Sequence, residues 1–111
     1  MLFINDNNRI IIFGLNDISL HLAQQLSKNK DVVILYNKIQ TKHSNLEETD
    51  VIIEKINSNL VSKIKSYKSN SNFIFISMTN NEELNIFTAQ LAQKFEAKKT
   101  MALIYSQKYN E

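Results

Sequence analysis

The sequence predicts an α/β fold, a three-layer sandwich in which helices cover both faces of a mainly parallel sheet of about five strands. Three observations predict it. Short β-branched apolar runs alternate with segments of helical periodicity, the first such run is apolar at every position, and no Asn-Gly or Asp-Gly hairpin signal occurs. The length of 111 residues and the 43% of hydrophobic residues fit one domain over residues 1–111.

Composition and charge exclude several classes of function. Without cysteine there is no disulfide scaffold, thiolate zinc site, iron–sulfur cluster or cysteine nucleophile. A net charge of +2, with scattered lysines, indicates no nucleic-acid partner. The longest apolar stretch, Ile10–Leu15, is far shorter than the roughly 20 residues that span a bilayer, so no direct membrane insertion is expected. Residues 1–9 lack the pattern of a secretory signal, and we therefore expect a cytoplasmic protein.

The first predicted unit is strand, helix, strand. Arg9–Phe13 is a short apolar run that ends at the only glycine, Gly14, and it reads as a buried strand. A helix follows with Asn16 or Asp17 as its N-cap, and Asp31–Tyr36 is a second buried strand. The helix should end near residues 28–30, and its apolar positions at helical spacing are Ile18, Leu22, Ala23 and Leu26.

The middle of the chain is less clearly patterned. Residues 37–50 are polar without strong periodicity, so at most a short or frayed helix is expected there. A brief strand at 51–54 and a weakly amphipathic helix from Leu60 to about Tyr67 follow. This helix stops in the Ser/Asn run at 69–72, which is a loop.

The last third repeats the alternation. A strongly apolar strand at 73–78 precedes a helix that opens at residues 80–83, and a fifth strand at 100–105 closes the series. Acidic residues lie at the start of this helix and lysines near its end, as the helix dipole prefers. Its predicted apolar face consists of Leu84, Phe87, Thr88, Leu91, Ala92 and Phe95.

The first strand-to-helix turn is the candidate phosphate-binding site of a Rossmann-like fold. It has the spacing G-x-G-x-x-G, with Gly14 in the first place, Asn16 in the second and Ser19 in the third. Asn16 tolerates the turn, but its side chain would occupy space that a pyrophosphate uses; Ser19 is small enough for close helix packing. A plain strand-to-helix turn is the alternative. The candidate phosphate-binding residues are Gly14, Leu15, Asn16, Asp17, Ile18 and Ser19.

Three further residues could contact a ligand. An Asp or Glu at the end of the second strand usually binds the adenosine ribose, and Tyr36 and Asn37 occupy that place. Asn37 could hydrogen-bond a ribose hydroxyl, and Tyr36 could cover an adenine. Lys55 could attract a phosphate, although a solvated lysine is the simpler interpretation.

No catalytic or metal site is predicted. The only histidines, His21 and His43, lack a second set of ligands at metal-binding spacing. Adjacent Glu82 and Glu83 suit the start of a helix, and no nucleophile, base and orienting group can be assembled. We therefore expect that the protein is not an enzyme.

Two blocks of sequence carry a family resemblance. Gly14–Ala23, following the apolar Ile10–Phe13, and Thr79–Asn85, followed by Ala89–Phe95, resemble the TrkA N-terminal domain family, also called RCK or KTN domains. The second block is the more specific, because the family typically has Thr-Asp-x-Asp-Glu-x-Asn after its fourth strand. The resemblance extends from Arg9 to about Tyr105.

The resemblance implies a cytoplasmic regulator of a potassium channel or transporter, peripheral to the inner face of the membrane. NAD or NADH, or else AMP, ADP or ATP, would bind and bias an assembly of such domains, with Thr79 bordering the ligand. The implied partner is a membrane potassium transporter or channel subunit. The apolar residues of the last helix suggest a second copy of the chain as a further partner. They are most simply core, but a surplus apolar strip there, joined by two tyrosines, could form a homodimer contact; the residues are Phe87, Leu91, Phe95, Tyr105 and Tyr109.

The departures from the family pattern all lie on the ligand side. Asn16 and Ser19 replace two glycines, Tyr36 or Asn37 replaces the ribose acid, and Glu54-Lys55 replaces the usual Gly-Asp after the third strand. An alternative function is therefore a degenerate Rossmann-like scaffold for dimerisation and interaction, without a bound nucleotide.

Overall fold

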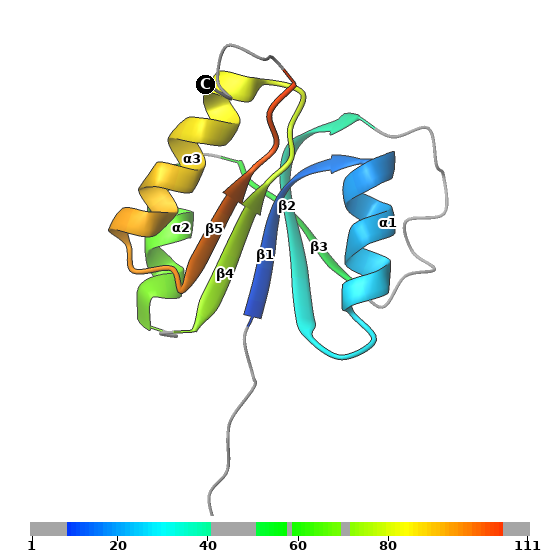
Figure 1. Ribbon diagram of the computed structural model, residues 1–111, viewed down its shortest axis with the longest axis horizontal. Helices are drawn as coiled ribbons and strands as arrows, with labels where there is room; N and C mark the ends of the chain where they lie inside the picture. The colour runs from blue at the N-terminus through cyan, green and yellow to red at the C-terminus, as the bar shows by residue number, and fades with distance from the viewer. Residues whose placement is uncertain (1–8, 41–50, 58, 70–71, 106–111) are drawn as a thin grey trace, which may run out of the picture.

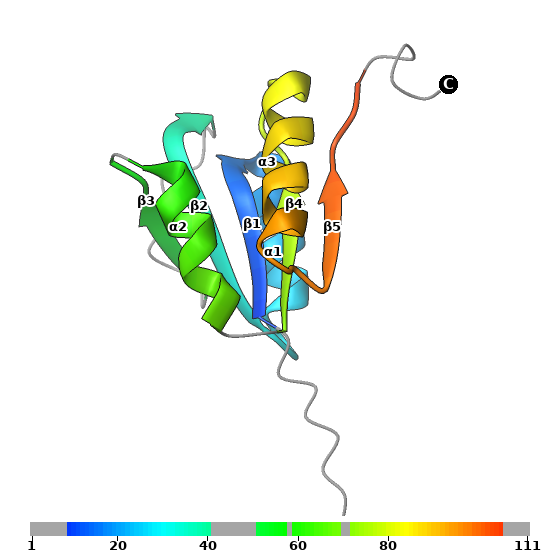
Figure 2. The same ribbon diagram turned by 90° about the vertical axis from the view of Figure 1, so that its left-hand side faces the viewer.

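The computed structural model describes residues 9–40, 51–57, 59–69 and 72–105. Five strands form one sheet in the order β3-β2-β1-β4-β5, and every neighbouring pair is parallel. Helix α1 covers one face, and α2 and α3 cover the other (Figure 1). Figure 2 shows β3 and β5 as the two edges of the sheet. The three-layer, Rossmann-like fold predicted from the sequence is confirmed.

The element boundaries confirm the predicted alternation of strands and helices. Within the described ranges, no helix is long and apolar enough to cross a membrane. The elements are β1 Arg9–Asn16, α1 Asp17–Leu26, β2 Asp31–Gln40, β3 Ile52–Lys55, α2 Leu60–Ser66 with a 3-10 turn at Tyr67–Ser69, β4 Phe73–Ser77, α3 Glu82–Lys94 and β5 Lys99–Ala102.

β5 ends at Ala102, three residues before the predicted end at residue 105, whereas β1 and β2 extend beyond their predicted ends. β1 continues through Gly14 to Asn16, because the strand resumes its pairing with β2 after a register shift at the glycine. Residues 37–40, where a frayed helix was conceivable, extend β2 instead. The rest of that segment, residues 41–50, lies outside the described residues.

The apolar strands are buried on both faces. In β1, Ile10 and Ile12 belong to the core cluster on the α1 side, and Ile11 and Phe13 belong to the cluster on the α2 and α3 side. Each of these four side chains is buried. Helices on both faces thus explain why the run is continuously apolar.

Two predicted core positions on helices are wrong. Ile18 is 63% exposed and Phe87 is 54% exposed. In α1 the other predicted apolar positions do pack against the core cluster, Ala23 buried and Leu22 and Leu26 partly buried, so only Ile18 departs from the predicted face. In α3 the buried face includes polar residues that bond to the end of β4, which apolar periodicity does not reveal. The buried residues of α3 are Asn85, Thr88, Ala89 and Ala92.

Candidate functional site

Gly14 brings the ends of β1 and β4 into close contact. Its φ is +120°, and a Cβ placed there would lie 2.9 Å from both the carbonyl carbon and the oxygen of Met78. The backbone nitrogen of Thr79 would be 3.0 Å away. A side chain at this position would therefore strain the backbone and push the two strands apart. Strand packing alone requires glycine here.

The turn from β1 into α1 is closed by reciprocal hydrogen bonds. The Ser19 amide donates to Asn16 Oδ1 at 2.8 Å, and the Asn16 amide donates to Ser19 Oγ at 3.0 Å, which together form a capping box. Ser19 Oγ also donates to the Gly14 carbonyl at 2.7 Å. Asn16 Nδ2 donates to the Met78 carbonyl at 2.8 Å, so this cap joins β1 to the end of β4.

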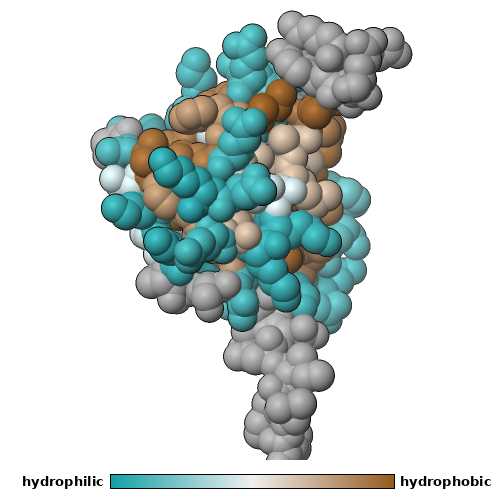
Figure 3. All heavy atoms as spheres, turned by 60° about the vertical axis from the view of Figure 1, so that its left-hand side comes forward, coloured by the Kyte–Doolittle hydropathy of each residue, from teal (hydrophilic) through white to brown (hydrophobic). Residues whose placement is uncertain are grey.

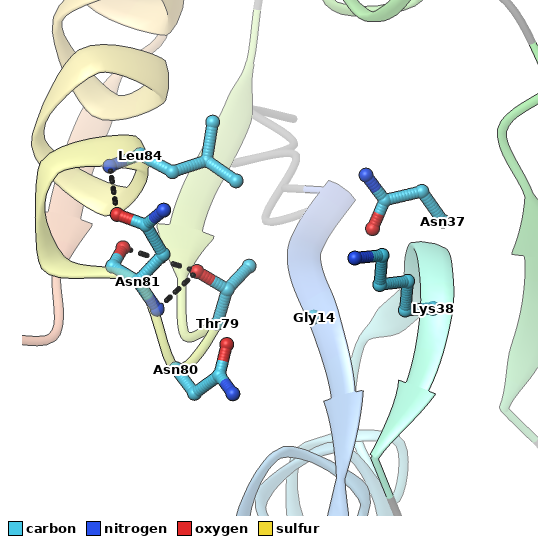
Figure 4. Close-up of a pocket in the computed structure, with 7 residues that line it drawn as sticks. All are labelled: Gly14, Asn37, Lys38, Thr79, Asn80, Asn81 and Leu84. Carbon is cyan, nitrogen blue, oxygen red and sulfur yellow. Dashed lines mark hydrogen bonds between the residues drawn. The ribbon is translucent and has the colours of Figure 1, made fainter.

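A cleft of about 120 Å³ opens at the carboxyl-terminal parts of β1 and β2 and beyond the end of β4. Figure 4 shows two walls: the end of β2 contributes Asn37 and Lys38, and the β4–α3 connection faces them. The walls offer amide, hydroxyl and ammonium groups, which suit the hydroxyls, ring atoms and phosphate of a nucleotide. The lining residues are Gly14, Asn37, Lys38, Thr79, Asn80, Asn81 and Leu84.

The structure brings some of the predicted site residues into this cleft and places the others elsewhere. Gly14, Asn37 and Thr79 line it. Leu15 and Ser19 are fully buried, and Tyr36 packs against the core cluster on the α1 side. The remaining predicted residues are Asn16, which caps α1, Asp17 and Ile18, which are exposed in its first turn, and Lys55, which is exposed at the end of β3.

Sequence reasoning missed four lining residues. Lys38 was overlooked because the predicted second strand stopped at Tyr36, two residues before it. Asn80, Asn81 and Leu84 were assigned only to the start of a helix. Asn81 is the N-cap of α3, since its Oδ1 accepts from the Leu84 amide at 3.0 Å. An Asn N-cap directly after a buried strand is a signal that could have placed this helix start at the carboxyl edge of the sheet.

Asn85 holds the β4–α3 connection in place. Its side chain is completely buried, and its Oδ1 accepts from Ser77 Oγ at 3.0 Å and from the Thr79 amide and hydroxyl at 2.9 and 2.6 Å. Its Nδ2 donates at 2.9 Å to the carbonyls of Thr79 and Leu103. The last residue of the Thr79–Asn85 motif therefore positions one wall of the cleft and joins it to the segment after β5.

In residues 9–40, 51–57, 59–69 and 72–105, no group of three or more His, Asp or Glu side chains lies close enough to hold an ion. The cleft itself offers hydrogen-bonding groups and one ammonium group.

Comparison with known proteins identifies the family. A family model described as the TrkA-N domain matches residues 10–111. The Trk system potassium uptake protein TrkA of Vibrio alginolyticus is 33% identical over 100 residues, which cover 86% of this chain and 21% of that protein. A TrkA homolog of Archaeoglobus fulgidus is 26% identical over 101 residues, which cover 91% of this chain and 23% of the relative. The chain thus spans less than a quarter of these relatives, and it belongs to the TrkA-N domain family.

Proposed function

We propose that this chain is a regulatory domain of a potassium transport system and that its cleft binds a nucleotide, either NAD or NADH or an adenine mononucleotide. The observation that carries the proposal is the position of the cleft. It lies at the carboxyl edge of the sheet, formed by the last parts of β1 and β2 and the connection after β4, beside the point where the strand order reverses, and open α/β sheets bind ligands at this edge. Membership of the TrkA-N family and the names of its relatives, which are potassium uptake proteins, support the role in potassium transport.

The proposed mechanism is binding without a covalent step. A ligand in the cleft would contact Asn37 and Lys38 on one wall and Thr79 and Asn81 on the other. It would therefore link the end of β2 to the start of α3. Such a ligand regulates transport only if it binds one arrangement of the assembly more tightly than another.

A thermal-shift screen tests nucleotide binding. NAD, NADH, AMP, ADP and ATP are each added to the purified chain, and a bound ligand should stabilise it by about 2.7 kcal/mol at a hundred times its dissociation constant. Lys38→Gln should reduce the shift because it removes the ammonium from the cleft. Lys28→Gln, an exposed change after the end of α1, is the matched control. An unchanged melting temperature with every nucleotide would contradict the proposal.

The proposed partner is a membrane potassium transporter or channel subunit at the cytoplasmic side of the membrane. Co-expression with a Trk-type transport subunit should allow the two to be purified together, and nucleotide should change the amount recovered. A chain that elutes alone with and without nucleotide would contradict this part of the proposal.

A second candidate, a dimerising scaffold without a ligand, is favoured by exposed apolar side chains. Phe87 on α3, Met101 on β5 and Tyr105 are 54%, 53% and 58% exposed. The face viewed in Figure 3 has apolar side chains among hydrophilic ones. Sedimentation should then show a dimer that Phe87→Glu disrupts, whereas Ile18→Glu, an equally exposed apolar position on α1, leaves it intact. A monomer at high concentration would exclude the scaffold.

A further inference from the structure

Two backbone amides at the N-terminus of α1, those of Asn16 and Ser19, donate to side-chain oxygens of the same turn. In Rossmann-like nucleotide sites, the backbone amides of this turn bind the ligand's phosphates. Here the Ser19 amide donates to Asn16 Oδ1, and the Asn16 amide donates to Ser19 Oγ, at 2.8 and 3.0 Å. A phosphate oxygen would have to displace both side chains to receive these hydrogen bonds.

The same side chain crosses the point where the strand order reverses. β1 and β4 flank that point in the order β3-β2-β1-β4-β5, and a dinucleotide lies across it with its pyrophosphate at the first helix. Asn16 Nδ2 donates to the Met78 carbonyl across this gap, and Gly14 lies directly against the Met78 backbone. The position of a pyrophosphate is therefore filled by an amide side chain.

The open cleft lies apart from α1. The structure describes all of α1, and no residue of this helix lines the cleft. The ammonium group of the cleft belongs to Lys38. This residue follows the position on β2 where an acidic residue usually binds the ribose of a nucleotide. Figure 4 shows the Lys38 side chain directed past Gly14 towards Thr79. The first turn of α1 carries the carboxylate of Asp17 instead. The Lys38 ammonium therefore favours a phosphate beside β2.

We propose that Asn16 and Ser19 determine ligand specificity by excluding pyrophosphate dinucleotides such as NAD and NADH. The cleft then accepts an adenine mononucleotide whose phosphate faces Lys38. The identity of the ligand rests on the proposed nucleotide binding. The exclusion rests only on the hydrogen bonds at the start of α1.

Calorimetric titration of the whole chain with NADH and, separately, with AMP tests the proposal. The parent should bind AMP more tightly than NADH. Asn16→Gly should raise the NADH affinity about tenfold, because it frees the Ser19 amide and the Met78 side of the gap. Asn59→Gly is the matched control: Asn59 caps α2 with the same type of bond, to the Ser62 amide at 3.1 Å, and does not line the cleft.

Two further variants test the two halves of the proposal. Asn16→Gly combined with Ser19→Ala frees both amides of the turn, and circular dichroism verifies that it folds. It should bind NADH at least as tightly as Asn16→Gly. Lys38→Gln should weaken AMP binding about tenfold, as expected for loss of one charged hydrogen bond, whereas Lys28→Gln should not change it.

Each outcome has a distinct meaning. NADH binding by the parent as tight as AMP binding overturns the exclusion and leaves the proposed function intact. Failure of both folded Asn16 variants to gain NADH affinity also overturns the exclusion. If the parent binds no nucleotide but the Asn16→Gly variant binds NADH, the result supports the exclusion and contradicts nucleotide sensing by the parent. AMP binding that is insensitive to Lys38→Gln overturns the mononucleotide assignment.

Discussion

The starts of α1 and α3 use the same cap in two different surroundings. Asn16 and Asn81 each accept a hydrogen bond from the amide three residues later, and each follows a central strand of the sheet. Asn16 is also bonded through its Nδ2 to the Met78 carbonyl and through its own amide to Ser19 Oγ. Asn81 is exposed and lines the cleft.

This difference shows that a helix start at the carboxyl edge of a sheet is not by itself a ligand site. At α1 the polar groups of the turn bond to one another and to the neighbouring strand. At α3 the fixed element is Asn85, one turn into the helix, and its buried bonds leave the residues at the helix start facing the cleft. The internal hydrogen bonds therefore determine which helix start is available to a ligand.

Substitution of Asn85 should have the largest effect. Asn85→Ala removes the partner of the Thr79 amide and of the Leu103 carbonyl and leaves the Thr79 carbonyl with only the Tyr105 hydroxyl, so we expect the free energy of unfolding to fall by about 4 kcal/mol. Urea denaturation measures it. Asn80→Ala, an exposed change in the same connection, should cost less than about 0.5 kcal/mol. Equal effects of the two changes would mean that Asn85 does not position this wall.

Gly14→Ala tests the close contact between β1 and the end of β4, beside the start of α1. The added methyl group would lie 2.9 Å from the Met78 backbone at a φ of +120°, and we expect a loss of about 3 kcal/mol. Denaturation in urea, followed by circular dichroism, gives the value. A loss below about 1 kcal/mol would show that the ends of β1 and β4 can separate easily.

The three Asn N-caps form a graded series. Asn16→Ala should cost about 2 kcal/mol, because it removes the cap and the bond to Met78. Asn81→Ala and Asn59→Ala remove exposed caps and should cost about 1 kcal/mol or less. Thermal unfolding ranks the three variants. An Asn16 variant no less stable than the other two would remove the evidence that the α1 turn is specially closed.

The smallest change in the free energy of unfolding is expected for the ion pair between α2 and β3, which lies away from the starts of α1 and α3. Lys63 on α2 forms an ion pair with Glu54 on β3, and the hydrogen bond to this carboxylate raises the Lys63 pKa above 10.5. The folded state thus holds the proton more tightly, so the pair stabilises the fold fully below pH 10.5 and stops doing so as the pH rises through the raised pKa. Lys63→Gln should cost about 0.5 kcal/mol at neutral pH.

The difference between parent and variant reports the charge of Lys63, which acts on both Glu54 and Tyr67. Burial raises the pKa of Tyr67, whose ring centroid lies 5.6 Å from the Lys63 ammonium, so both proteins lose stability above pH 10.0. The difference measured by urea denaturation should shrink towards zero at high pH. Lys65→Gln, an exposed change on the same helix, is the control. A difference that stays constant with pH would exclude a charge effect.

Three of the residues that line the cleft were predicted from the sequence. Gly14 and Asn37 were predicted because the carboxyl ends of parallel strands meet at one edge, and Thr79 was predicted from the family resemblance. Lys38 and Asn81 were missed because the length of β2 and the cap of α3 depend on pairing and packing with distant segments. The pairing of β1 beyond Gly14, after a register shift, likewise has no local signal.

The sequence by itself determined the α/β class, the alternation of elements and the burial of both faces of the central strands, because these follow from local periodicity and apolar content. Only the tertiary structure decided which helix start is open. That choice depends on hydrogen bonds between residues far apart in the chain, such as Asn16 to Met78 and Asn85 to Leu103, whose geometry exists only after the strands are assembled.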